Sequence, residues 1–180
     1  MPGSLPIALV AALLGACSPT YNWREIRPEG GGFAVMVPAR PSKMSRAIDL
    51  DGLAVTMTMH GARVDSASYT VGVVELPEDS ARVRAHAVDA MRRGMLRNIG
   101  AAADITLTAT SVPVGAIGAT AMARIGATMV RASGRRGDQA LQMVAVFVAR
   151  GRHAWQAVAL GASLPDASTR LFTDSLRLLP

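Results

Sequence analysis

The chain is short of cysteine, lysine and aromatic residues, and each shortage excludes a class of site. It has one cysteine, Cys17, which cannot form a disulfide within the chain or the cysteine cluster of a structural zinc site. A single cysteine also leaves at most one thiol for nucleophilic catalysis. Aromatic residues make up 4% of the sequence, and no basic run is interleaved with them, so we expect no nucleic-acid partner.

Charged residues are also few, 18% of the chain, whereas 50% of the residues are apolar. Such a composition excludes intrinsic disorder and is sufficient for one domain with a real core. Lys43 is the only lysine, and arginines give the chain a formal net charge of +6. This basic balance favours anionic headgroups or an acidic protein as partners. Beyond residue 16, no apolar stretch is long enough to predict a membrane-spanning helix.

The chain opens with an apolar run, residues 5–14, followed by Gly-Ala immediately before Cys17. About ten residues are too few to span a ~30 Å hydrocarbon core, so the run predicts a secretory signal. The alternative is an N-terminal apolar strand or helix that ends in an ordinary buried cysteine. Small residues directly before a cysteine resemble the lipobox of bacterial lipoproteins, in which that cysteine is diacylated and becomes the mature N-terminus.

The lipobox resemblance implies a domain organisation and an address. Residues 1–16 are the expected signal peptide, residues 17–21 the lipidated tether, and residues 22–180 a single domain. Cys17 is the expected lipid attachment site. Ser18 stands where an aspartate would favour inner-membrane retention, so we expect a periplasm-facing location at the outer membrane.

Most of the expected domain alternates between apolar and polar residues, as β-strands do. Residues 139–149 and 154–160 are apolar on both faces, which predicts central strands of a sheet covered on both sides. Asp51-Gly52 is a strong signal for a hairpin turn, and residues 134–138 are expected to form a turn between two further hairpin arms. The strands predicted are 22–27, 33–37, 44–50, 53–64, 66–76, 104–112, 116–130, 139–149 and 154–160.

The period changes to that of a helix between Asp79 or Ser80 and Ile99, with Met91 and Met95 on the inward face. A second helix is expected to begin at 165–167. Two helices and a mostly antiparallel sheet predict an α+β fold with helices covering both faces, a three-layer α/β/α sandwich.

Three short motifs lie along the expected domain: Gly32, Phe33, Val35, Pro38 and Pro41; Ser68, Tyr69 and Val71; and Phe172, Ser175, Leu176, Arg177 and Leu178. They resemble motifs of bacterial lipoproteins and exported proteins with a PsbP-like sandwich domain. This superfamily also includes the photosystem II extrinsic subunit and a nuclear import factor that binds the Ran GTPase. The resemblance implies the same sandwich fold and an accessory or binding role rather than catalysis.

The sequence contains no nucleophile elbow, P-loop, H-E-x-x-H or dinucleotide fingerprint, so we expect no enzyme, cofactor or metal. The histidines, His60, His86 and His153, lie on separate predicted elements. His60 shares a strand face with Thr56 and Thr58, a polar cluster that a solvated edge strand explains equally well.

A second acidic cluster follows the strand that ends near Glu75. Glu78 and Asp79 complete it, and it could be read as an acid pair or a cation site. The favoured interpretation is a strand end followed by a helix N-terminus, where negative charge is stabilising.

The exposed face of the first helix carries Arg82, Arg93 and Arg97, with Asp89 among them. These arginines are candidate contacts for anionic lipid or an acidic protein, and the alternative is a merely solvated face. The methionines are expected to fill the core between helix and sheet and not to bind copper, which would need them exposed together. They are Met57, Met59, Met91 and Met95.

Two functions remain open at this point. The first is a membrane-anchored, periplasm-facing accessory or binding module without catalytic activity. The alternative is a carrier of a small apolar ligand in a pocket under the long helix. A cavity between the Met91/Met95 face and the sheet would favour the carrier, whereas dense packing there would favour the interaction module.

Overall fold

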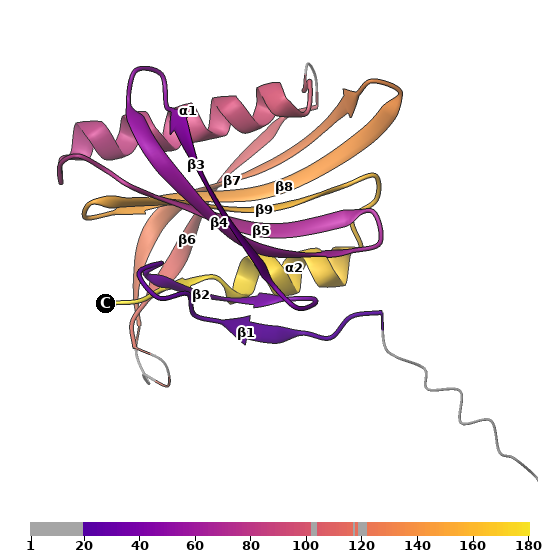
Figure 1. Ribbon diagram of the computed structural model, residues 1–180, viewed down its shortest axis with the longest axis horizontal. Helices are drawn as coiled ribbons and strands as arrows, with labels where there is room; N and C mark the ends of the chain where they lie inside the picture. The colour runs from indigo at the N-terminus through magenta and orange to yellow at the C-terminus, as the bar shows by residue number, and fades with distance from the viewer. Residues whose placement is uncertain (1–19, 102–103, 117, 119–121) are drawn as a thin grey trace, which may run out of the picture.

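The computed structural model describes residues 20–101, 104–116, 118 and 122–180. Cys17 and the rest of the expected signal lie outside the described residues, so the lipobox remains a prediction. One curled sheet and two helices make up the fold (Figure 1). The elements are β1 (Arg24–Ile26), β2 (Phe33–Val37), β3 (Ser42–Asp49), β4 (Ala54–Val64), β5 (Ala67–Glu75), α1 (Ala81–Asn98), β6 (Thr106–Val114), β7 (Ala123–Arg136), β8 (Gln139–Arg150), β9 (His153–Gly161), α2 (Asp166–Ser175) and β10 (Arg177–Leu178).

The sheet has the strand order β1-β2-β10-β6-β7-β8-β9-β5-β4-β3. Neighbouring strands are antiparallel, except that β10 pairs with β6 in parallel. The central positions of β8 and β9 confirm the prediction from their two apolar faces. In this register Phe147 lies opposite Gln156, and Gln156 lies opposite Gly72 of β5.

The β3–β4 hairpin forms where the Asp-Gly signal predicts it. Asp51 and Gly52 both have positive φ, 52° and 94°, as a tight hairpin turn requires, and the Gly52 N–H donates to Asp49 Oδ1 at 2.7 Å. The paired strands begin earlier than the sequence indicates, because Ser42 is already opposite Gly61. β3 ends the sheet, so one of its two backbone edges has no neighbouring strand.

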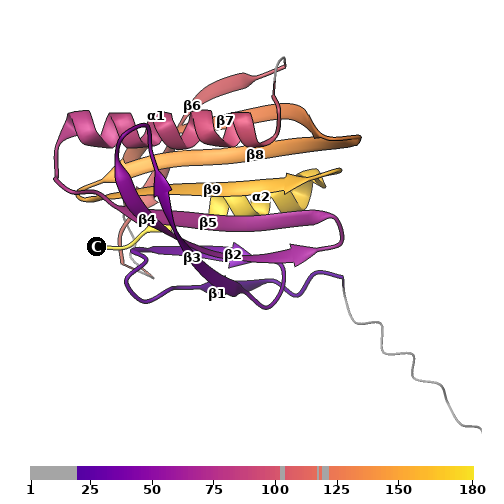
Figure 2. The ribbon, with the colours of Figure 1, turned by 45° about the horizontal axis from the view of Figure 1, so that its top comes forward.

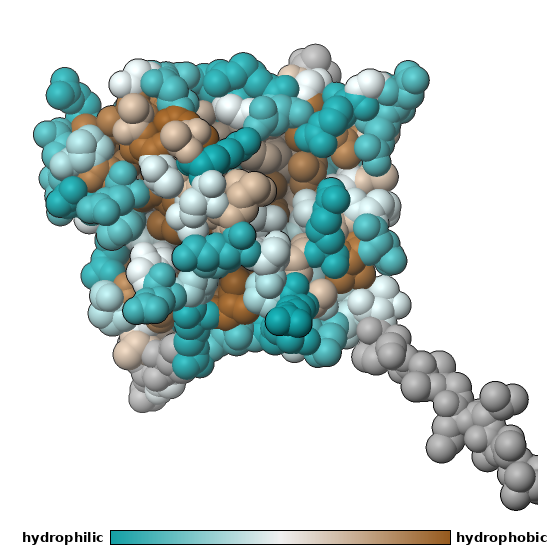
Figure 3. Space-filling model, in the orientation of Figure 1, coloured by the Kyte–Doolittle hydropathy of each residue, from teal (hydrophilic) through white to brown (hydrophobic). Residues whose placement is uncertain are grey.

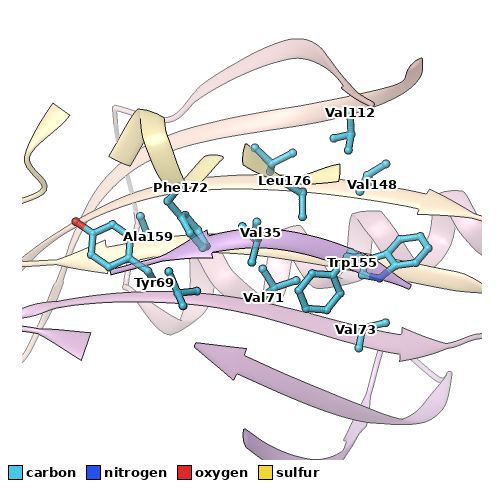
Figure 4. Packing of buried hydrophobic residues seen from close by; sticks show 14 of the residues in the cluster. Val35, Tyr69, Val71, Val73, Val112, Val148, Trp155, Ala159, Phe172 and Leu176 are labelled. Carbon is cyan, nitrogen blue, oxygen red and sulfur yellow. The ribbon is translucent and has the colours of Figure 1, made fainter. Parts of the chain in front are cut away.

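The sheet curls until its two ends approach each other across a shared core (Figure 2). Trp23, beside β1, meets Tyr69 of β5 edge to face with 6.0 Å between ring centroids, and Phe33 of β2 meets His60 of β4 at 6.1 Å. α2 lies inside the curl against β2 and β9 (Figure 1). Figure 4 shows Phe172 of α2 among these buried side chains, and the rings of Tyr69 and Phe172 are 5.5 Å apart.

The convex face is covered by α1, which packs on β8 and β9. Ser80 begins the helix by accepting a hydrogen bond from the Val83 N–H at 3.2 Å, as predicted for an N-cap. Met91 is buried at 2% exposure, which confirms that it lies on the inward face of the helix, and Phe147 beneath the helix is fully buried. Met95 is only half-buried.

The prediction of a three-layer α/β/α sandwich, PsbP-like, with helices covering both faces of a sheet, is wrong. Over the residues that the structure describes, the fold is a ten-stranded curled sheet, a half-barrel, with only two helices, of 18 and 10 residues. These helices are too few to form full layers over ten strands. Curling lets the sheet bury most of its concave face against itself, which strand periodicity does not reveal.

The predicted bounds of β7 were also wrong, because the sequence predicted a strand over residues 116–130. Residues 134–136, expected in a turn, continue β7 to Arg136. The Arg135 N–H donates to the Ile99 carbonyl at 2.7 Å, so the end of α1 and this strand hold each other in place. Within the described residues, no helix is both long and apolar enough to cross a membrane.

Candidate functional site

The hollow that bears most directly on function lies between α1 and the β3–β4 hairpin. We call it the methionine groove. Its volume is about 210 Å³, and apolar surface is visible beside α1 and the hairpin, framed by polar side chains (Figure 3). It is lined by Arg46, Ile48, Asp49, Leu50, Met57, Ala90, Met91, Gly94, Met95, Arg97, Asn98 and Gln156.

Gln156 brings a carboxamide into the otherwise apolar floor of the groove. It lies on the central strand β9 and is only 8% exposed. Its Nε2 donates to Met57 Sδ at 3.7 Å, and a thioether is a weak acceptor. A Cβ at Gly72 would stand 3.0 Å from that sulfur and 3.3 Å from Gln156 Cγ, so the glycine leaves the room that both side chains occupy.

Gly94 opens the opposite wall. It lies in the interior of α1, where glycine costs roughly 1 kcal/mol relative to alanine. A Cβ built there meets only Arg97 Nη2, at 4.0 Å. Packing therefore does not require glycine at this position, and its absence of a side chain widens the groove.

The hairpin tip closes one end of the groove by binding α1. His86 Nε2 lies 2.9 Å from the Leu50 carbonyl oxygen. Arg93 donates to Asp51 Oδ2 at 2.7 Å. This hydrogen bond, with the positive charges of Arg93, Arg97 and His86, lowers the pKa of the Asp51 carboxyl.

The three arginines of α1 do not share one environment. Arg93 contacts both Asp51 and Asp89, whereas Arg97 Nη2 lies 3.8 Å from Asp51 Oδ1. Arg82 is exposed, and no ion pair forms on it within the part of the chain that the structure describes. The structure therefore places the predicted surface on one helix but neutralises part of its charge.

A second hollow, the polar cavity, lies on the concave side of the sheet between the β1–β2 loop and strands β3, β4, β5 and β9. Its volume is about 280 Å³. It is lined by Glu29, Gly30, Gly31, Lys43, Thr56, Thr58, His60, Val73, Glu75 and His153.

The polar cavity brings two histidines together that the sequence leaves apart. His60 and His153 both line it because β5 separates β4 from β9 by a single strand. Burial lowers the pKa of His60, and the positive charge of Lys43, its partner across the hairpin, lowers it further. The His153 ring stacks on Trp155 with 5.6 Å between centroids, and Trp155 Nε1 donates to the Gly31 carbonyl at 2.8 Å.

The acidic cluster at the end of β5 is divided among separate partners. Glu75 forms an ion pair with Arg152 at 3.1 Å, Glu78 accepts a hydrogen bond from Ser80 at 2.9 Å, and Asp79 contacts Arg84. Across residues 20–101, 104–116, 118 and 122–180, no group of three or more His, Cys, Asp or Glu side chains is placed to hold a metal ion.

The sequence identifies the methionines of the groove but not the polar residues of its other wall. Met91 and Met95 follow from helical periodicity and Met57 from strand alternation, whereas Arg46 carries no local signal. A polar residue within the apolar strand 154–160 was the one available clue to Gln156. No protein-family model and no curated protein sequence matches the chain, so the resemblance to PsbP-like lipoproteins stays a prediction.

Proposed function

We propose that this protein is a lipid-anchored, periplasm-facing binding protein of the cell envelope that carries a small, largely apolar ligand in the methionine groove. One observation carries the proposal. An open hollow of about 210 Å³ lies between α1 and the β3–β4 hairpin, with the half-buried Met95 in its wall and the buried Met91 and Met57 beneath it. Of the two functions open from the sequence, this feature favours the carrier.

The chemistry of the lining supports binding over catalysis. Methionine side chains are flexible and polarizable, and they adapt to ligands of varied shape. Ligand sites are typically apolar with a few placed polar groups, as here with Gln156 and two arginines. The lining contains no serine, cysteine or histidine, so it supplies no common nucleophile or imidazole base.

The proposal is tested by methyl NMR of the full chain carrying Cys17→Ser, with carbon-13 in its methionine methyl groups. We expect 1-octanol to shift the signals of Met57, Met91 and Met95 in a saturable manner. Met36, which lies on β2 away from the groove, is the internal control. Equal shifts at all methionines, or none, would show that the groove does not take an apolar ligand.

The second candidate function is an accessory module that contacts an anionic membrane surface or an acidic protein through α1. The exposed, unneutralised Arg82 and the weakly paired Arg97 favour it. A lipid tether would hold this helix near a membrane, where each basic residue contributes about 1 kcal/mol. Both functions are compatible with one anchored domain.

A further inference from the structure

We propose that the ligand of the methionine groove is a free medium-chain carboxylate, with its carboxylate bound by Arg46 and Arg97. This inference rests on the proposed carrier function and names its ligand class. Three features of the groove carry it: its size, its positive rim and the amide in its floor.

The size of the groove selects a single short chain. An apolar cavity of about 150 Å³ holds benzene, so a volume of about 210 Å³ has room for one small ligand. That space accepts one alkyl chain of medium length but not the two long chains of a phospholipid. Met57, Met91 and Met95 provide the apolar contact that such a chain needs.

The charges at the rim of the groove favour a ligand with a negatively charged head group. Arg46 and Arg97 both line it, and Asp49 is the one carboxylate among the lining residues. Among the described residues Arg46 makes no ion pair, and the only ion pair of Arg97 is the long one with Asp51, 3.8 Å. The planar guanidinium matches a carboxylate in geometry, so these two groups provide a charge-assisted site.

The floor provides a further polar group beside the groove. Gln156 is 8% exposed, and its amide Nε2 donates to the Met57 sulfur at 3.7 Å, a weak acceptor. A ligand oxygen would be a better acceptor for this amide, which favours a ligand with a polar group. Arg46 lies directly opposite Met57 in the hairpin register, so Gln156 and Arg46 flank the same methionine.

The experiment compares three ligands with the same chain length, octanoate, 1-octanol and octylammonium, on the full chain with Cys17→Ser at neutral pH. We expect octanoate to bind at least about tenfold more tightly than 1-octanol, and octylammonium to bind more weakly than either. Raising the salt concentration from about 0.05 M to about 0.5 M should reduce this preference, because the rim charges are exposed.

Variants identify the groups responsible. Arg46→Gln combined with Arg97→Gln should reduce the ratio of octanoate to octanol affinity to about one, whereas Arg82→Gln, on α1 outside the groove, should leave the ratio as it is. Gly94→Leu should remove binding of both ligands by filling the groove, with Gly94→Ala as the control for helix propensity.

The outcomes separate this inference from the proposed function. Equal affinities for octanoate and 1-octanol would overturn the carboxylate proposal and leave the carrier function standing. Failure of both ligands to bind would overturn both. Binding of a two-chain anionic phospholipid in preference to octanoate would replace the free carboxylate by a membrane lipid.

Discussion

At the scale of residues, two glycines shape the methionine groove because they have no side chain. Gly94 leaves space in the wall of α1, and Gly72 leaves space under Met57 and Gln156. Buried residues elsewhere on this face are tightly packed, with Phe147, Ala145 and Ile99 fully buried. The convex core is therefore dense beneath α1, and the groove opens beside the helix, where Met95 is half-buried.

Phe147 tests the dense part of the core. It is fully buried on the central strand β8, in the layer between α1 and the sheet. Phe147→Ala should lower the free energy of unfolding by about 3–5 kcal/mol, because a large aromatic side chain leaves a cavity. Urea unfolding followed by circular dichroism measures the change, and a loss below about 1 kcal/mol would contradict tight packing at this site.

His60 in the polar cavity makes stability depend on pH. Its pKa is lowered in the folded protein, so the unfolded chain binds the proton more readily. Stability is therefore lost as the pH falls below about 6.5 towards the folded pKa, and it is fully present above that range. The charged and titratable groups around His60 are Lys43, Glu29, Glu75 and His153.

The measurement compares thermal unfolding of the parent and His60→Gln at about pH 7.5 and about pH 5.5. The parent should lose more stability on acidification than the variant, because the variant has no imidazole to protonate at this position. An equal loss in both proteins would show that His60 does not couple folding to pH.

At the scale of elements, the β3–β4 hairpin and α1 form one unit through their contacts at the hairpin tip. Asp51 joins Arg93, and His86 joins the Leu50 carbonyl. These contacts set the width of the groove, and they also neutralise part of the α1 arginine surface. The same hairpin thus affects both candidate functions.

The arginines of α1 are expected to contribute unequally to membrane binding. The delipidated chain should bind anionic vesicles weakly, and binding should fall as salt rises. Replacing Arg82, Arg93 and Arg97 together by glutamine should abolish binding without unfolding the domain. Arg93→Gln alone should have a smaller effect than Arg82→Gln, because two carboxylates already contact Arg93.

Vesicle co-sedimentation measures this order, and neutral vesicles serve as the control. If the triple variant binds anionic vesicles as the parent does, the arginines are only solvated and the accessory-module candidate loses its support.

At the scale of the whole molecule, function depends on where the domain is held. A carrier tethered at a membrane samples ligands that partition there, and an unanchored one does not. In the proposed lipoprotein, acylation of Cys17 would determine this location, and Cys17 lies outside the residues that the structure describes.

Cys17→Ser should leave the protein without its lipid anchor and shift it from the membrane fraction to the soluble fraction of the envelope. Cell fractionation and intact-mass spectrometry of the mature protein check this. Detection of an unmodified Cys17 in the mature parent protein would overturn the lipoprotein interpretation.

The local pattern of apolar and polar residues predicted most helices and strands of this protein but little of its tertiary structure. Two-residue alternation identified the strands other than β10, two apolar faces placed β8 and β9 at the centre, and helical spacing after Ser80 located α1. These signals succeed because each depends on neighbours within one or two turns of the chain. They failed at residues 134–136, where a contact with Ile99 extends β7.

Only the tertiary structure decided the curl of the sheet, the convergence of His60 with His153, and the groove between α1 and the hairpin. Each depends on residues that are far apart in the sequence, such as Gln156 and Gly72 in one row of the sheet. Strand alternation shows which face of a strand is apolar, but it does not show whether a helix, another strand or a ligand covers that face. The sandwich prediction assigned this role to helices, whereas the sheet covers most of its concave face by curling over itself.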